Sequence, residues 1–206
     1  MRLRISVSKR KTWNEGGTDM AAYTLTGGRE LRVAISGKSG CGNTTVSTLL
    51  AKALGVQLIN FTFRQLAVEK GMTLAEVIEG ARTDDSYDIA VDTRQVELAR
   101  AGSCVLGSRL AIWMLREADL KVYLVASEDT RAKRIQNREG GDLQAIKDFT
   151  AMRDREDSAR YLKLYGIDNN DYGFADLNID TATRTPEQIV ALILDWLEAH
   201  GRIAKS

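Results

Sequence analysis

The chain has 206 residues, enough to build one sizeable hydrophobic core. Its 29 Lys and Arg residues almost balance its 28 Asp and Glu residues, so the net charge of +1 gives no electrostatic reason to expect nucleic acid or an anionic membrane as a partner. The two cysteines fit no disulfide framework, no apolar run approaches the roughly 18 residues of a spanning helix, and the first thirty residues lack a signal-peptide apolar region, so we expect a cytoplasmic protein.

The N-terminal segment differs from the rest of the chain. Residues 1–30 carry six basic residues against three acidic ones and show little helical periodicity. We predict a poorly ordered extension over this segment, and Met20 could be the genuine start of translation. The alternation of Leu3, Ile5 and Val7 leaves open a stray edge strand instead.

A strand, a glycine-rich turn and a helix follow one another from residue 31. Residues 31–36 form a short apolar run typical of a buried strand. Val46 and Leu50 begin an apolar repeat at helical spacing, and Gly55 stands where a glycine ends many helices. This order is the setting that a phosphate-binding loop requires.

The turn itself matches a phosphate-binding loop except at one position. The pattern Gly-x4-Gly-Lys-Ser/Thr is met at Gly37, Gly42 and Thr44, but Asn43 stands in place of the lysine. Backbone N–H groups at a helix N-terminus attract phosphate, and the hydroxyl of Thr44 is a candidate ligand for Mg²⁺. The alternative is an ordinary glycine-rich turn. The predicted ATP-binding residues of the loop are Gly37, Lys38, Ser39, Gly40, Cys41, Gly42, Asn43, Thr44 and Thr45.

The missing lysine raises the question of which cation neutralises the phosphates. Asn43 keeps two N–H donors, so it can contact a phosphate oxygen but cannot neutralise it. Lys38 lies five residues earlier, and we predict that its flexible side chain partly supplies the missing charge and makes it a catalytic residue. The alternative for Lys38 is a solvated surface lysine. Cys41, within the same loop, could be oxidisable.

The remaining chain alternates strand-like and helix-like segments. Strands are expected at 56–60, 103–107, 120–125 and 176–180. Helices are expected at 64–71, 74–82, 88–101, 109–117 and from 186 to about 200. Thr73 is a predicted N-cap, and Thr185 with Gln188 fits a capping box. We therefore predict a three-layer α/β/α fold with a five-stranded parallel sheet, whose ligands gather at the carboxyl ends of the strands.

One segment departs from this regular pattern. Residues 128–171 contain many charged and few large apolar side chains, so we predict a mobile lid. The alternative is a solvated helical pair with ion pairs between successive turns.

From residue 31 to about 200 the chain resembles the cytidylate kinases, in the short archaeal and spirochaete-type branch of the nucleoside monophosphate kinases. Asn43 is the main departure, since that family carries lysine there. The matching segments are 33–37, 63–67, 92–95, 107–111, 134–138, 153–157, 160–161, 165–168 and 176–177.

The resemblance implies a domain over 31–206 that transfers the γ-phosphoryl group of ATP to CMP or dCMP, with an acceptor-binding region at about 61–100 and the lid at about 128–171. It also implies a role for each of several polar residues. For the acceptor nucleotide these are Arg64, Asp92, Arg109 and Arg153; for ATP, Arg134 against the adenine and Arg138 at the phosphates; for the transferring phosphoryl group, Arg155 and Arg160. Arginine suits these roles because its planar fork binds phosphate oxygens in pairs.

Other interpretations of these residues stay open. Arg64 and Asp92 could be plain surface residues of a helix, and the lid arginines could form salt bridges with adjacent acids. No carboxylate follows the strand at 103–107, so Mg²⁺ would rest on Thr44, substrate phosphates and water. We expect a monomer acting on free nucleotides. The alternatives are a kinase of another small acceptor, or a nucleotide-binding regulatory protein in which Asn43 has ended useful catalysis.

Overall fold

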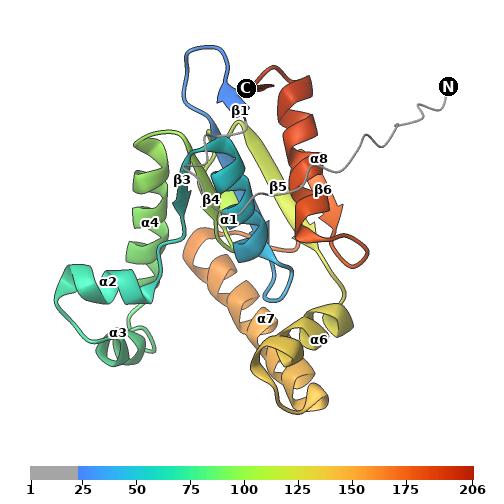
Figure 1. Cartoon of the computed structure of the whole chain (residues 1–206). Coiled ribbons are helices and arrows are strands. Elements are labelled where there is room, and N and C mark those ends of the chain that lie inside the picture. Colours follow the sequence, from blue (N-terminus) through green and yellow to red (C-terminus); the bar gives the residue numbers. More distant parts are fainter. Residues whose placement is uncertain (1–22) are drawn as a thin grey trace, which may run out of the picture.

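The structure, a computed structural model, describes residues 23–206 and contains a parallel sheet flanked by helices (Figure 1). The strands are β1 (Tyr23–Leu25), β2 (Arg32–Gly37), β3 (Gln57–Ile59), β4 (Cys104–Gly107), β5 (Leu120–Val125), β6 (Leu177–Asp180) and β7 (Ile203–Lys205). The helices are α1 (Asn43–Leu54), α2 (Phe63–Lys70), α3 (Leu74–Gly80), α4 (Ser86–Arg100), α5 (Ala111–Met114), α6 (Glu128–Glu139), α7 (Leu143–Tyr165) and α8 (Pro186–Ala199).

The main sheet has the strand order β3-β4-β2-β5-β6, and each neighbouring pair of its strands is parallel. Strands of a parallel sheet are buried on both faces, which explains why β2, β4 and β5 are almost continuous apolar runs. The predicted five-stranded α/β/α fold is confirmed.

Two apolar cores hold the layers together. On one face, Val46 and Leu50 of α1 and Ile193 of α8 pack against Ile35 and Val122 of the sheet. On the other face, α4 and α5 cover the sheet, with a second core around Leu106 and Tyr123. The predicted helix ends are also confirmed: Gly55 ends α1 with a φ of +64°, and capping boxes begin α3 at Thr73 and α8 at Thr185.

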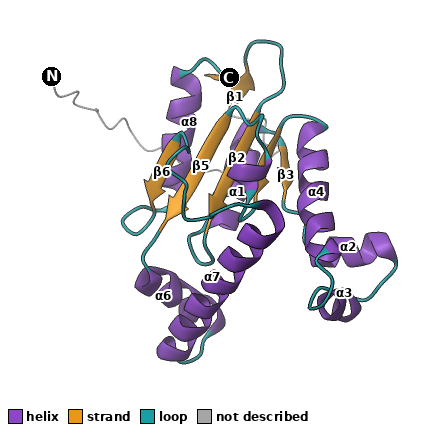
Figure 2. Cartoon of the chain, turned by 180° about the vertical axis from the view of Figure 1, so that it is seen from behind, coloured by secondary structure: helices purple, strands orange, loops and turns teal. Residues whose placement is uncertain are grey.

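The helical segments that lie away from the sheet are all found at one end of it. Figures 1 and 2 show α2 and α3 on one side of that end and the α6–α7 pair on the other, with the loop before α1 between them. This is the carboxyl end of β2, where the sequence predicts the ligand site.

Two predictions about the chain need correction, and a further group is not tested. The poorly ordered extension does not include Tyr23–Leu25, because these residues form β1 and pair antiparallel with β7, which the sequence pattern did not indicate. The helix expected at 109–117 is only the single turn α5, since residues on either side are turns. The predictions for Leu3, Ile5, Val7 and Met20 lie outside the described residues.

Candidate active site

The turn between β2 and α1 needs its glycines. Gly40 and Gly42 have φ values of +84° and +94°, in the left-handed region that favours glycine. A Cβ on Gly37 would lie 2.9 Å from the Leu124 carbonyl oxygen, and one on Gly40 would lie 3.0 Å from Cβ of Arg131. No side chain caps α1 at its N-cap, Gly42, so the N–H groups of the first turn are available to an anion.

Asn43 takes a structural position in this turn. Its Nδ2 donates to the carbonyl oxygens of Ile35 and Ser108, each at 3.2 Å, and its Oδ1 accepts from the Ser47 hydroxyl at 3.0 Å. The amide therefore ties the carboxyl ends of β2 and β4 to the start of α1. Both of its N–H donors are used, so this geometry does not support the expected contact between the Asn43 side chain and a phosphate oxygen.

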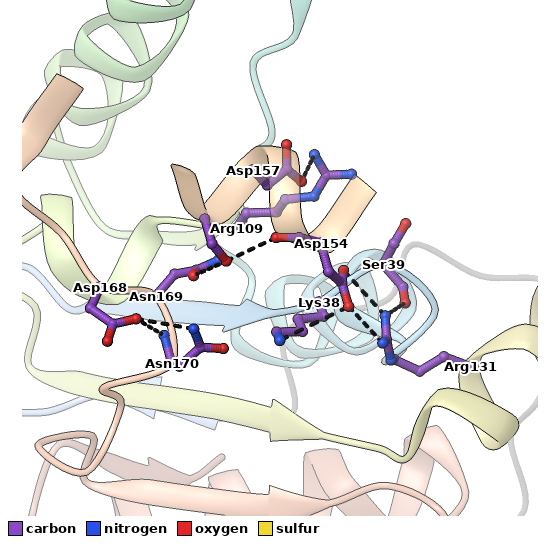
Figure 3. Close-up of polar contacts among 10 residues, drawn as sticks. Lys38, Ser39, Arg109, Arg131, Asp154, Asp157, Asp168, Asn169 and Asn170 are labelled. Atoms are coloured by element: carbon purple, nitrogen blue, oxygen red, sulfur yellow. Dashed lines mark hydrogen bonds and ion pairs between the residues drawn. The ribbon is translucent and has the colours of Figure 1, made fainter. Parts of the chain in front are cut away.

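Lys38 and Arg131 converge on one carboxylate of α7 (Figure 3). The Arg131 guanidinium lies 2.7 Å from Asp154 Oδ2 and donates to the carbonyl oxygen of Ser39 at 3.1 Å. Lys38 Nζ lies 3.9 Å from the same Asp154 oxygen, and its side chain is 31% exposed. The ammonium group of Lys38 is therefore held beside α7 by a weak ion pair, and Lys38 is not the freely solvated lysine of the alternative interpretation.

Arg131 and Arg134 of α6 both donate hydrogen bonds to the loop before α1. Arg134 donates to the Thr181 hydroxyl at 2.8 Å, to the Thr181 carbonyl oxygen at 2.6 Å and to the Gly40 carbonyl oxygen at 3.4 Å. Arg131, which sequence reasoning missed, is only 2% exposed. The signal was present, because Arg131 and Arg134 are three residues apart and so share a helix face. The adenine contact expected of Arg134 stays a prediction.

The loop opens into a cavity of about 850 Å³ that reaches the acceptor-binding region. Most of the predicted site residues line it, although they come from six segments of the chain. They are Gly37, Lys38, Ser39, Gly40, Gly42, Asn43, Thr44, Thr45, Arg64, Asp92, Arg109, Arg134, Arg138, Arg153 and Arg160.

Two predicted site residues are not brought to the cavity. Cys41 is 2% exposed in the apolar core that the sheet shares with α1 and α8, so its side chain does not reach the cavity. Burial raises the pKa of its thiol, which disfavours oxidation. Arg155 is an exposed residue of α7 and does not line the cavity. It lies two residues from Arg153, which places the two side chains on different faces of the helix. The predicted catalytic role of Arg155 has no support from this geometry.

The far end of the cavity is cationic. Arg109 and Arg160 both pair with Asp157 of α7, at 2.9 and 2.7 Å, and Arg160 also lies 3.5 Å from Asp88. Desolvation and the nearby Arg109 guanidinium lower the pKa of Arg153. Since two guanidinium groups share one buried carboxylate and a third lies close by, this end is suited to an anion with several oxygens.

A second feature of the acceptor region is the buried carboxyl group of Asp92. The Tyr165 hydroxyl donates to its Oδ2 at 2.9 Å, and Gln95 Nε2 donates to its Oδ1 at 3.4 Å. Burial raises the pKa of Asp92 to about 6, although the Tyr165 hydrogen bond opposes this and Asp88 adds to it. The alternative of a plain surface residue does not describe this carboxyl group.

Asp92 should make the folded protein less stable as the pH rises. Because the folded state binds this proton more tightly than the unfolded chain, the free energy of unfolding falls as the pH rises from about 4 through about 6. Asp92→Asn removes the buried charge, so this variant should exceed the parent in stability at about pH 8, by up to about 3 kcal/mol, and match it near pH 4. Urea denaturation at both pH values measures this difference, with exposed Asp195→Asn as control. A difference that is the same at both pH values would contradict the prediction.

The described residues also limit how a metal ion could be held. Thr44 is exposed to the cavity, and no group of three or more Asp, Glu, His or Cys side chains suited to a metal occurs within residues 23–206. This donor set fits Mg²⁺ held by one hydroxyl and by phosphate oxygens and water, because Mg²⁺ gives up water reluctantly.

The comparisons with known proteins agree with this geometry. A family model described as an AAA domain matches residues 33–158. Shikimate kinase from Bacteroides thetaiotaomicron has a similar fold, with a TM-score of 0.57 and 16% identity over 82% of this chain and 98% of that one. The family model, together with the glycine loop before α1, identifies a P-loop protein, and the similarity to shikimate kinase shows the shared α/β fold.

Curated relatives identify the family. Cytidylate kinase 2 of Borreliella burgdorferi is 43% identical over 82% of this chain and 96% of its own length. Cytidylate kinase of Pyrococcus horikoshii is 40% identical over 84% of this chain and 92% of its own. The chain belongs to the cytidylate kinase family.

Among the described helices, none has the length and apolarity needed to cross a membrane.

Proposed function

We propose that this protein transfers the γ-phosphoryl group of ATP to CMP or dCMP, giving ADP and the corresponding diphosphate. The observation that carries the proposal is a continuous cavity that joins a phosphate loop to a cluster of arginines. A protein that only bound nucleotide would not need cations at the far end. The similarity to the cytidylate kinases supports CMP as the acceptor.

Each end of the cavity would position one of the two reacting phosphate groups. The N–H groups at the start of α1, with Lys38 and Arg138, would hold the ATP phosphates. Arg64, Arg109 and Arg153 would hold the acceptor phosphate. Positioning both phosphates in line and neutralising their charge supplies most of the rate in phosphoryl transfer, so no general base with an unusual pKa is required.

Asp157 and Asp154 carry negative charge, as the phosphates do, and in this structure they form ion pairs with arginines of the site: Asp157 with Arg109 and Arg160, and Asp154 with Arg131. When the acceptor phosphate binds, it would compete with Asp157 for Arg109 and Arg160. Arg160 is then available to the transferring phosphoryl group. The Thr44 hydroxyl, with phosphate oxygens and water, would hold Mg²⁺, and the ion would supply neutralisation of charge on the phosphoryl oxygens.

The surrounding segments fit the same proposal. Residues of about 61–100 would cover the acceptor, and residues of about 128–171 would close as a lid that excludes water. The near-zero net charge supports free nucleotides as partners, with neither nucleic acid nor membrane involved. We propose that the protein acts as a monomer in the cytoplasm.

A coupled assay that detects ADP tests the activity, with ATP as donor and CMP, dCMP, UMP or AMP as acceptor. We expect turnover with CMP and dCMP and thermal protection by both. Turnover with another acceptor alone would overturn the acceptor assignment. Nucleotide binding without turnover at high enzyme concentration would overturn the activity and favour a regulatory protein.

Lys38 provides a second test of the site. Because Asn43 cannot neutralise the phosphates, Lys38→Ala should lower kcat/KM for ATP by roughly 10–100-fold, which corresponds to the loss of one charge-assisted hydrogen bond. The matched control is Lys133→Ala on α6, an exposed lysine outside the cavity. Steady-state kinetics at saturating CMP measure the effect, and activity equal to that of the parent would rule out the role of Lys38.

A further inference from the structure

The acceptor side of the cavity contains a buried amide with an unused acceptor atom. Gln95 of α4 is 4% exposed and lines the cavity. Its Oε1 is buried and accepts no hydrogen bond within the described part of the chain. A buried carbonyl oxygen without a donor is unfavourable by roughly 1–3 kcal/mol, so such an atom calls for an explanation.

The orientation of this amide is set by its neighbour. Gln95 Nε2 donates to Asp92 Oδ1 at 3.4 Å, and the other carboxyl oxygen of Asp92 accepts from the Tyr165 hydroxyl at 2.9 Å. Turning the Gln95 amide over would bring its carbonyl oxygen against the carboxylate oxygen of Asp92. The network of Tyr165, Asp92 and Gln95 therefore keeps Oε1 as the free atom, and that atom can only accept a hydrogen bond.

The helix places this atom along the acceptor side of the cavity. Asp88, Asp92 and Gln95 are four and three residues apart, so they lie on one face of α4. All three line the cavity, as do the apolar side chains of Phe61, on the loop before α2, and Val91 of α4. Asp88 also lies near Arg160, which belongs to the cationic end. A ligand with a phosphate at that end and a flat ring among the apolar side chains could reach Gln95.

We propose that Gln95 selects the base of the acceptor by accepting a hydrogen bond from the exocyclic amino group of cytosine. The amino group at C4 of cytosine offers two N–H donors. Uracil carries a carbonyl oxygen at the same place, which would face Gln95 Oε1 with no hydrogen between the two acceptors. A site whose buried polar atom pairs with one substrate and stays unpaired with another discriminates strongly between them. This inference rests on the proposed function, because it assigns the base specificity of that site.

The test combines a change in the protein with a change in the base. The affinities of CMP and UMP are measured by calorimetry for the parent and for Gln95→Met, and kcat/KM is measured for both acceptors. Methionine has nearly the same length and no acceptor oxygen comparable to Oε1. We expect the ratio of kcat/KM for CMP to kcat/KM for UMP to fall by roughly 10–100-fold in the variant, and the ratio of the two affinities to fall with it. The loss should come mainly from weaker CMP binding, and the KM for ATP should not change.

The matched control is Leu98→Met, one turn further along α4, where a partly buried side chain packs against the core. This control should keep the parental ratio. If Gln95→Met weakens CMP and UMP equally, or leaves the ratio unchanged in a protein with the parental melting temperature, the inference is overturned. Gln95→Asn shortens the side chain by one methylene and so moves the acceptor oxygen away from the base. This variant should also lower the CMP-to-UMP ratio of kcat/KM, which would show that the effect is not specific to the methionine side chain.

The failure of this inference differs from the failure of the proposed function. A parent that turns over CMP but whose preference is insensitive to Gln95 overturns the inference alone. A parent that binds CMP with a preference dependent on Gln95, yet transfers no phosphoryl group, overturns the proposed activity alone. A parent that does not bind CMP overturns both.

Discussion

Replacing Arg160 with alanine is expected to lower kcat/KM for CMP phosphorylation by about 10³-fold or more, which is the effect of losing an arginine from the transferring phosphoryl group. Arg160 lines the cavity, and its guanidinium is held by Asp157 and Asp88. Coupled kinetics with ATP and CMP measure the change. Asp157 keeps Arg109 as a partner in the variant, so the fold should persist, and the melting temperature checks this.

The control for this experiment comes from the same helix. Arg155→Ala removes an equal charge from an exposed position of α7 that does not line the cavity, and we expect activity within about two-fold of the parent. Equal losses in the two variants would mean that the arginines act through general charge or through helix stability. A large loss in Arg155→Ala alone would restore the prediction made from the sequence and would exclude Arg160 as the decisive residue.

Removing the carboxylate of Asp154 is expected to lower the free energy of unfolding more than any other substitution discussed for this protein. Asp154→Ala leaves the guanidinium of Arg131, 2% exposed, with the Ser39 carbonyl oxygen and without its counter-charge. An uncompensated buried charge of this kind destabilises a protein by about 3–5 kcal/mol. Urea denaturation measures the change in the free energy of unfolding. Asp148→Ala, at an exposed position of the same helix, should change stability by less than about 0.5 kcal/mol.

The double variant Arg131→Met/Asp154→Leu separates two explanations of such a loss. If the unpaired charge is the cause, removing both partners should recover most of the stability, since an apolar pair of similar volume can replace a buried ion pair. If the double variant is as unstable as Asp154→Ala, the contribution of Asp154 lies elsewhere, for example in its weak contact with Lys38. The double variant should still lose activity, because Arg131 no longer supports the Ser39 carbonyl oxygen in the phosphate loop.

The regular elements followed from local patterns. The apolar run before Gly37, the helical repeat from Val46 and the cap at Gly55 are all short-range signals, and each is found where it was expected. The capping box at Thr185 is equally local. Local sequence patterns did not predict the short length of α5 or the pairing of β1 with β7. A single turn of helix carries little periodicity, and β1 and β7 are three-residue strands whose partners are about 180 residues apart.

The composition of the site was predictable from residue types, but the direction of the side chains was not. The sequence indicates that arginines gather in the segment 128–171. It does not indicate that Arg160 turns into the cavity while Arg155 turns away, because that depends on which face of α7 packs towards the loop. Arg131 was missed for a related reason. Its burial depends on Asp154 reaching it from another helix, 23 residues along the chain.

By itself, the sequence predicted a site for a nucleoside triphosphate on an α/β scaffold, because glycines at fixed spacing between a strand and a helix are typical of a phosphate-binding loop. It also identified the position at which the loop departs from its pattern. Only the tertiary structure decided what Asn43 does there. Its two amide donors are directed to the carbonyl oxygens of Ile35 and Ser108, which come together only when β2 and β4 pair in the sheet. The same holds for Gln95, whose free acceptor is set by a carboxyl group and a tyrosine hydroxyl that meet only in the folded protein.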